Sequence, residues 1–475
     1  MESRSSSLAR IHTPFDDMIP EVNEPSARFY LDAMRIYLAL STGTISFEEG
    51  IEAAKDLKKN PEFARSPTNP IHMPINEYYK SKIIDNLKTL KKFNLLTRDS
   101  IRSAYSFVFV SQVVPINDLD LSVLGHLAQW PRDSITAIAG ALHIVPRTVT
   151  RSIGRLKERH MLRSHAHLDN TPWGINTTIV FFTPCEDIEW EEIEDRLLYY
   201  PYLKAILKTA MTDLGYVSFI VPGYMKNHQT LANSIKSLSG SVFDYVSIHE
   251  EIAVGANRNL SLYKDGQWLF PESAKLLLED ESHTLPEANS RMLPCAGFNK
   301  SLTPIDYRIG LAGKFGSRAT PSELVSALTD QGVEVDVKRV SVTLKKLYDK
   351  GLMKPYLVYA LGLSSDFCFE IVCNTEWRDR IAAILPLLPY TMFFMSSRGI
   401  IVWASVPGSQ QVEYYQMFRL LEDHPGVKSV KSIMTITMKG SRLISDLIGS
   451  WRYTKNGYTA PSEDFNLASF LSEPL

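Results

Sequence analysis

The sequence contains one pattern of residues twice, about 186 positions apart, and this internal repeat constrains the fold more than any other feature. Asp120 and Ala141 in the first copy correspond to Asp306 and Ala327 in the second. A Val-Pro-Gly tripeptide also recurs, at 221–223 and at 406–408. Repeated spacing of this kind indicates that one architectural unit is used twice. We therefore expect a tandem duplication within the 475 residues.

Apolar residues at helical spacing recur in three segments. In each segment four apolar residues follow one another at intervals of four, three and five: Ile83, Leu87, Leu90 and Leu95; Val149, Ile153, Leu156 and Met161; Val340, Leu344, Leu347 and Leu352. This spacing predicts a helix followed by a turn that returns an apolar side chain to the same core. Two shorter helices are expected before each long one. Ser134 is expected to cap one of them, and Thr320 to form a capping box with Glu323.

Alternating apolar and polar residues downstream of each long helix predict strands. The order strand, helix, strand, strand, helix, strand is expected over 176–250 and again over 367–440, with 427–440 as a single final strand. Such units form a four-stranded antiparallel sheet with two helices on one face. The predicted fold class is α+β, with winged helix-turn-helix units combined with two βαββαβ ferredoxin-like domains.

Eight segments follow from these patterns. They are a flexible N-terminus (1–25), an N-terminal helical unit and possible degenerate winged helix (26–112), a first winged helix-turn-helix (117–170), a first ferredoxin-like domain (171–252), a linker or insert (253–303), a second winged helix-turn-helix (304–360), a second ferredoxin-like domain (361–440) and a C-terminal tail (441–475). Trp268 in the insert is expected to pack on a domain. Trp451, Tyr453, Tyr458 and Phe465 in the tail are expected to dock on the chain's own fold or on a partner.

The overall charge excludes a globally basic protein, because 51 Lys and Arg residues face 53 acidic ones. Any nucleic-acid site must therefore be local. The four cysteines form no CxxC pair, which favours a reducing cytoplasm, and Cys368 and Cys373 are expected in the core on opposite faces of a strand. No apolar stretch is long enough for a membrane span or a secretion signal, so we expect a cytoplasmic protein without a membrane partner.

Arginines recur every four residues along the helix predicted from Arg147. Arg147, Arg151 and Arg155 lie opposite the apolar stripe, and the segment 132–163 holds seven basic residues against two acidic ones. An isolated row of this kind is usually a solvated surface. Within a helix-turn-helix, however, it favours contact with double-stranded DNA, because Arg binds guanine edges and phosphates. The candidate DNA-binding residues are Arg147, Thr148, Thr150, Arg151, Arg155, Arg163, Lys338, Arg339 and Lys345.

The second copy is a weaker candidate for DNA contact. Its turn before Val340 is five residues longer than the turn before Val149, and Val342 lies among the lysines. The longer turn is expected to alter the placement of the helix, so DNA contact by this copy stays open. The N-terminal segment is expected only to pack or to contact phosphate.

Searches for catalytic and cofactor motifs identify none. A phosphate-binding loop, a nucleophile elbow and an HExxH motif do not occur. His160, His165 and His167 are interpreted as surface residues or phosphate contacts on the basic wing rather than as metal ligands. On the surface these three side chains would add positive charge at mildly acidic pH. The sequence thus predicts no catalytic residues, no cofactor, no metal site and no enzymatic activity.

Residues 117–169 resemble the DNA-binding half of the Lrp/AsnC feast/famine regulators, from the opening Leu-Asp to the basic wing closed by Leu168-Asp169. The following βαββαβ unit is similar to their ligand-sensing domain. The resemblance implies a transcriptional regulator, a small-molecule effector, homo-oligomers, and a fused tandem whose two sheets pair as a pseudo-dimer. Gly215 and Gly399 match the glycine of the family's effector loop. The acidic residue that follows it in the family is missing, which argues against a free amino acid as effector.

Two other functions stay open. The same tandem scaffold resembles the sirohaem decarboxylases of haem biosynthesis, which are enzymes, and fold alone does not exclude that function. A chromatin-associated protein that binds DNA with little sequence preference is the third alternative.

Overall fold

The computed structural model describes residues 11–14, 16, 25–63, 77–92, 116–209, 214–280, 282–286, 289, 291–434, 436–441 and 444–472. The chain divides into two units, which are described separately. Unit 1 comprises Met1–Ser164 and Leu357–Gly362, and unit 2 comprises His165–Tyr356 and Leu363–Leu475. Most of the expected 1–25 segment, Leu95 and the rest of 93–112 lie outside the described residues.

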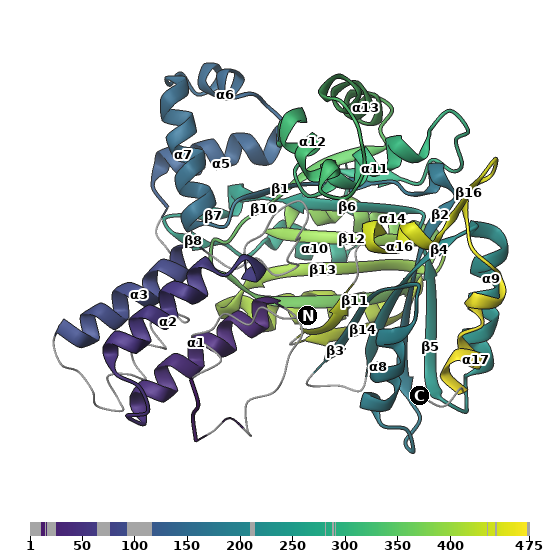
Figure 1. The fold of residues 1–475 in the computed structure, drawn as a ribbon. Helices are drawn as coiled ribbons and strands as arrows, with labels where there is room; N and C mark the ends of the chain where they lie inside the picture. Colours follow the sequence, from purple (N-terminus) through teal and green to yellow (C-terminus); the bar gives the residue numbers. More distant parts are fainter. Residues whose placement is uncertain are drawn as a thin grey trace. The chain divides into compact units, whose positions relative to one another are not determined.

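Unit 1 begins with three helices, α1 (Pro25–Ser41), α2 (Phe47–Lys59) and α3 (Glu77–Lys92) (Figure 1). Helix α2 starts with a capping box in which the Ser46 side chain accepts from the backbone N–H of Glu49. This satisfies an amide that has no partner inside the helix. The three helices share a core that includes Phe29, Ile83 and Leu87, as the apolar spacing predicted.

The first helix-turn-helix of unit 1 consists of α5 (Asp118–Gln129), α6 (Ile135–Ala141) and α7 (Pro146–Arg159). Ser134 caps α6 by accepting from the backbone N–H of Ala137, which confirms its predicted role. Val149 and Leu156 on α7 are buried, so the predicted apolar stripe is the one that packs.

The second helix-turn-helix lies in unit 2 and consists of α11 (Pro304–Lys314), α12 (Pro321–Thr329) and α13 (Val337–Asp349). The capping box between Thr320 and Glu323 is present as predicted. Strands β1 (Arg163–Leu168) and β10 (Met353–Val358), which follow the two long helices, pair with each other in a two-stranded sheet. Most residues of both strands belong to unit 2.

Unit 2 also contains two larger sheets. The first sheet has the order β15-β3-β4-β2-β5 and the second the order β14-β11-β13-β12-β6-β9. Their strands are β2 (Ile175–Pro184), β3 (Leu203–Thr209), β4 (Gly215–Pro222), β5 (Phe243–Glu250), β6 (Ala253–Arg258), β9 (Met292–Pro294), β11 (Leu363–Cys373), β12 (Tyr390–Ser396), β13 (Gly399–Pro407), β14 (Val427–Met434) and β15 (Ile436–Ser441).

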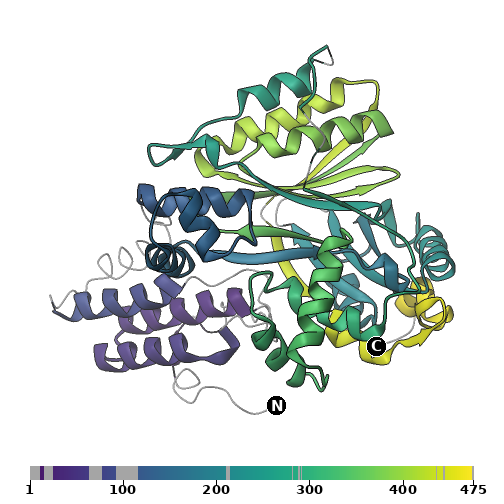
Figure 2. The same cartoon turned by 90° about the horizontal axis from the view of Figure 1, so that it is seen from above.

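Helices cover one face of each sheet. Helices α8 (Trp190–Tyr199) and α9 (Tyr224–Ser237) belong to the first sheet, and α14 (Thr375–Ile384) and α15 (Gln411–Arg419) to the second. Figure 2 shows the helices of the second sheet on one side of its strands. The α+β fold with helix-turn-helix and ferredoxin-like parts is thus confirmed.

The two sheets exchange strands, which the sequence did not predict. Strand β6 follows β5 along the chain but pairs with β12 of the second sheet. Strand β15 follows β14 but pairs with β3 of the first sheet. The single strand expected over 427–440 is therefore two strands in different sheets, and 253–258 is a sheet strand rather than part of a linker. Alternation identifies a strand locally but carries no information about its partner.

The exchange joins the two ferredoxin-like units into a pseudo-dimer, as the resemblance implied. Phe181, Tyr216, Phe394 and Ile401 belong to one apolar cluster formed by residues of both sheets. Cys368 is part of this cluster, whereas Cys373 belongs to the core that includes residues of α14 and α15. Both cysteines are buried on opposite sides of β11, as predicted.

The insert and the tail pack on unit 2. The insert forms β7 (Tyr263–Lys264), β8 (Gln267–Trp268) and α10 (Glu272–Glu279), and Trp268 is buried as expected. The tail forms α16 (Ile444–Leu447), β16 (Arg452–Thr454), β17 (Gly457–Thr459) and α17 (Leu467–Ser472). Trp451, Tyr458 and Phe465 join the core of the first sheet, so the tail docks on its own fold.

Candidate functional site

Helix α7 presents the candidate DNA-binding residues of the first copy. Arg147, Thr150 and Arg151 are exposed, and Thr148 is half-buried. The Thr150 hydroxyl donates to the Pro146 carbonyl oxygen at 3.1 Å. Arg163, at the start of β1, donates to the Leu162 carbonyl oxygen at 3.1 Å. The two guanidinium groups at 147 and 151 thus face solvent one helical turn apart.

Arg155, the third member of the arginine row, is held by Asp120 of α5. Its Nε and Nη2 atoms donate to the two carboxylate oxygens at 2.8 and 2.6 Å, and the Ser152 hydroxyl donates to the same carboxylate at 2.5 Å. Burial raises the pKa of Asp120, but the hydrogen bonds from Arg155 and Ser152 outweigh it and leave the pKa lowered. The Asp120 carboxylate therefore fastens α7 to the first helix of its unit.

The second copy repeats this contact between a buried aspartate of the first helix and the long helix, which we call the anchor. The positions along α13 correspond to those of α7 at an offset of 191 residues, as in Val149 and Val340. Asp306 accepts from the Thr343 hydroxyl at 3.2 Å and from Arg339 Nη2 at 2.7 Å, and Lys346 Nζ lies 3.5 Å from its second oxygen. Thr343 and Lys346 thus take the places of Ser152 and Arg155.

The exposed face of α13 differs from that of α7. Lys338 and Lys345 are exposed, as Arg147 and Arg151 are. The position that corresponds to Arg151 is Val342, whose surface is 57% exposed. Val340 nevertheless packs with Leu324 and Leu328 of α12, so the longer turn leaves α13 docked on its unit.

The three histidines of the wing do not lie on the surface, which corrects the expectation. His160 is 2% exposed and His165 is 4% exposed. His167 is half-buried and stacks on Tyr356 with the ring centroids 4.5 Å apart. Burial lowers the pKa of His160, and burial together with nearby Lys and Arg residues lowers the pKa of His167 to about 3. The His167 ring is therefore neutral at mildly acidic pH.

His167 belongs to a cluster of ionisable side chains inside unit 2, which we call the cationic cluster: His167, Lys204, Arg258 and Lys314 with the carboxylates Asp169 and Glu251. The charges of Lys314, Arg258 and Lys204 each depress the pKa of His167. Burial lowers the pKa of Lys204, and burial together with Lys204 lowers the pKa of Lys314 to about 8. Repulsion among these basic groups is therefore a property of the site.

The two carboxylates only partly balance the basic residues. Burial raises the pKa of Glu251, and nearby Lys204 opposes that rise. Burial also raises the pKa of Asp169, whose oxygens accept from the backbone N–H groups of Ala296 at 2.7 Å and Thr171 at 2.9 Å. Three half-buried basic side chains beside two carboxyl groups whose pKa is raised favour an anion nearby.

Different elements contribute the members of this cluster. His167 is on β1, Lys204 on β3, Arg258 at the end of β6 and Lys314 at the end of α11. The Arg258 guanidinium lies over the Tyr390 ring and donates to the Asn257 carbonyl oxygen at 2.6 Å. Apart from His167, the members of the cluster are not predictable from the sequence, because they are far apart in the chain and form no motif.

Gly215 and Gly399, which match the effector-loop glycine of the resembling family, are required here by close packing. A Cβ atom at Gly215 would collide with the Trp190 ring, and one at Gly399 would collide with the Ile371 carbonyl oxygen. Gly399 also has a φ of +151°, which disfavours any other residue. Packing thus accounts for both glycines.

The part of the chain that the structure describes contains no group of three or more His, Cys, Asp or Glu side chains placed to hold a metal ion. Among the described helices, none has the length and apolar character needed to cross a bilayer.

Comparison with known proteins gives matches only among solved structures. No protein-family model and no curated protein matches the sequence. The sirohaem decarboxylase NirDL matches with 8% identity and a TM-score of 0.37, over 75% of this chain and 99% of that chain. The same enzyme in complex with an iron-uroporphyrin III analogue matches with 9% identity and a TM-score of 0.36, over the same shares. PH0061 matches with 15% identity and a TM-score of 0.22, over 29% of this chain and 92% of that chain.

These matches concern the fold, and they correct one expectation. The sequence predicted a protein without enzymatic activity, but two of the three matched structures are of an enzyme. The prediction that this chain is not an enzyme is therefore withdrawn. The physical reason is that a helix-turn-helix and ferredoxin-like scaffold does not determine the chemistry of the sites that it carries.

Proposed function

We propose that the cationic cluster of unit 2 binds a small molecule with several carboxylates, of the tetrapyrrole class, and that the chain is an enzyme acting on it. The observation that carries this proposal is the gathering of Lys204, Arg258 and Lys314 beside His167. Lys and Arg side chains form strong charge-assisted hydrogen bonds with carboxylates. The structures of similar fold include a sirohaem decarboxylase in complex with an iron-uroporphyrin III analogue, which has the same ligand chemistry.

Loss of CO2 is the reaction that the cluster suits. When a carboxylate leaves as CO2, the electron pair of the broken C–C bond stays on the carbon and must be captured by a proton. Lys314, with its pKa lowered to about 8, holds a proton at neutral pH and releases it more readily than an ordinary lysine. In this proposal Lys204 and Arg258 orient the carboxylates, and Lys314 Nζ supplies the proton.

Titration of the full chain with uroporphyrin III, followed by absorbance, tests the proposal. We expect saturable binding that Lys204→Gln and Lys314→Gln each weaken about tenfold or more, because each removes a charge-assisted hydrogen bond. Lys264→Gln, at an exposed lysine of β7, is the control. Mass spectrometry of the product measures the loss of CO2. No saturable absorbance change would refute the binding site, and binding without loss of CO2 would refute the enzyme.

Contact with double-stranded DNA through α7 is a second proposal. The exposed guanidinium groups of Arg147 and Arg151 favour it, with Thr148, Thr150 and Arg163 alongside. Arg155 is assigned a structural role and not a DNA contact, because its guanidinium is bound to Asp120. In the second copy Lys338 and Lys345 are the candidates, and Arg339 is bound to Asp306. Sequence-specific regulation, homo-oligomers and a cytoplasmic location stay predictions.

A further inference from the structure

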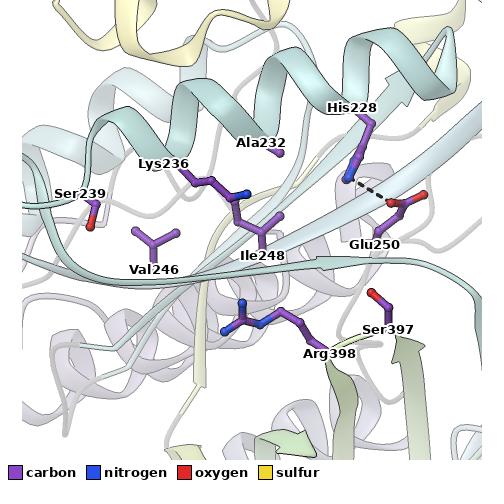
Figure 3. A pocket seen from close by; sticks show the side chains of 9 residues that line it. All are labelled: His228, Ala232, Lys236, Ser239, Val246, Ile248, Glu250, Ser397 and Arg398. Carbon is purple, nitrogen blue, oxygen red and sulfur yellow. Dashed lines mark ion pairs between the residues drawn. The ribbon is translucent and has the colours of Figure 1, made fainter. Parts of the chain in front are cut away.

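A pocket of about 500 Å³ opens along strand β5 in unit 2. Helix α9 contributes His228 and Lys236, β5 contributes Ile248 and Glu250, and the turn between β12 and β13 contributes Arg398 (Figure 3). Strand β5 is an edge strand of the first sheet, and the turn belongs to the second. The volume lies within the range of about 300–1,000 Å³ typical of small-molecule sites. None of these residues belongs to the cationic cluster.

The charge of this pocket is positive. His228 Nε2 lies 3.0 Å from Glu250 Oε2, and Asn176 donates to the other oxygen of Glu250 at 3.2 Å. The only carboxylate of the lining is therefore already satisfied. Lys236 and Arg398 are exposed and form no ion pair with any residue in the described ranges. Figure 3 shows Lys236 on the α9 side of β5 and Arg398 on the other side.

The turn that carries Arg398 is fixed by a buried polar network. The Arg398 backbone N–H donates to the Ser396 hydroxyl oxygen at 3.1 Å. Ser396 Oγ lies 2.8 Å from His249 Nδ1, and His249 Nε2 lies 2.8 Å from Glu370 Oε1. His249 and Glu370 have no exposed surface. The backbone that carries Arg398 is therefore already ordered, so binding of an anion has to order only the arginine side chain.

We propose that this pocket binds a small molecule bearing a carboxylate or phosphate group, held between Lys236 of α9 in the first ferredoxin-like half and Arg398 of the β12–β13 turn in the second. Arg forms bidentate hydrogen bonds with both groups, and Lys adds a point charge. The apolar side chains of Val246 and Ile248 contact the carbon part of the ligand. Because the two basic residues come from different ferredoxin-like halves, the ligand links the two halves of the pseudo-dimer.

Calorimetric titration of the full chain with inorganic phosphate, and separately with succinate, tests this inference. We expect saturable binding of at least one probe, weakened about tenfold by Arg398→Gln and by Lys236→Gln, because each removes one charged contact. The probe that binds identifies the anionic group. Lys264→Gln, a matched loss of one exposed positive charge outside the pocket, is expected to leave binding unchanged.

Two results would overturn the inference. One is the absence of saturable binding of both probes at millimolar concentration. The other is an equal weakening by Lys264→Gln, which would indicate a nonspecific effect of net charge. The uroporphyrin titration of Arg398→Gln is expected to match that of the unmodified chain, so failure at this pocket and failure of the cationic cluster are separate outcomes.

Discussion

The two helix-turn-helix units use the same anchor but assign their basic residues differently. In the first, Asp120 binds Arg155 and Ser152, and Arg147 and Arg151 stay exposed. In the second, Asp306 contacts both Arg339 and Lys346, and a valine takes the place of Arg151. A row of basic residues on a helix therefore contains some side chains that are bound to their own unit and others that stay exposed. The first unit retains the stronger candidate surface.

The anchor of the first unit also explains why the spacing of the arginines wrongly suggested that Arg155 is exposed like Arg147 and Arg151. Arg155 lies on the same helical face as Arg147 and Arg151, so spacing alone groups all three. Only the position of Asp120 separates them, because a buried carboxylate requires a partner.

The largest expected effect comes from removing the anchor of the first unit. Asp120→Ala leaves the Arg155 guanidinium and the buried Ser152 hydroxyl without their acceptor, and we expect a loss of about 3 kcal/mol in the stability of this unit. Hydrogen exchange of peptides covering α7, with urea unfolding of the full chain, measures it.

Asp306→Ala is the matched change in the second unit. Its partner Arg339 is 47% exposed, and Lys346 Nζ lies 3.5 Å from the carboxylate, farther than the Arg155 nitrogens lie from Asp120, so we expect a smaller loss of about 1–2 kcal/mol. Equal losses in both variants would contradict the view that the two hydrogen bonds from Arg155 make the first anchor the stronger of the two.

Measurement of DNA affinity tests whether the exposed faces of α7 and α13 differ in binding. Arg151→Val gives α7 the residue that α13 has at this position, and we expect a loss of about 1–3 kcal/mol in binding to duplexes selected from a random library. Lys264→Gln, which removes one exposed positive charge from β7 and not from α7, is the control. If Arg151→Val binds every duplex as tightly as the unmodified chain, α7 does not contact DNA through this residue.

The reciprocal substitution in α13 tests the same difference between the two helices. Val342→Arg gives α13 the residue of α7, and we expect a gain of up to about 1 kcal/mol, because a new phosphate contact adds affinity and steepens the salt dependence. Affinity measured at two salt concentrations checks it. An unchanged salt slope would show that α13 is not positioned against DNA.

The smallest expected effect is on how the free energy of unfolding changes at acidic pH. Folding lowers the pKa of Asp120 below its ordinary value of 3.8. The contribution of its carboxylate to the free energy of unfolding is therefore complete above pH 3.8 and is lost as the pH falls through the lower pKa of the folded chain. Between about pH 6 and about pH 3, Asp120→Asn should lose less stability than the unmodified chain, since the amide does not titrate. Urea unfolding at several pH values measures the slope. Parallel slopes would show that Asp120 does not titrate differently in the folded chain.

Local sequence patterns predicted the parts of the fold whose causes are local. Ser134 and the Thr320 capping box are confirmed because a cap satisfies amides three residues away. The buried stripe with Val149 and Leu156 is confirmed because helical spacing decides which side chains share a face. The two βαββαβ units follow from alternation and from the repeat.

The candidate sites were predicted less well. The arginine row was found, but the bond of Arg155 to Asp120 spans 35 residues, and sequence spacing does not report it. The cationic cluster was missed because its members lie on β1, β3, β6 and α11. The wing histidines were placed on the surface, although His165 and His167 stack on Tyr356.

The sequence by itself determined the duplication, the order of helices and strands in each repeat apart from β6 and β15, the helix caps and the buried stripes, because each depends on neighbours within a few turns or one strand. The tertiary structure alone decided the exchange of β6 and β15, the division of basic residues between anchors and exposed faces, and the two sites where positive charge gathers in unit 2. Pairing of strands and charges depends on which distant segments meet, and backbone hydrogen bonds between strands are the same for every sequence.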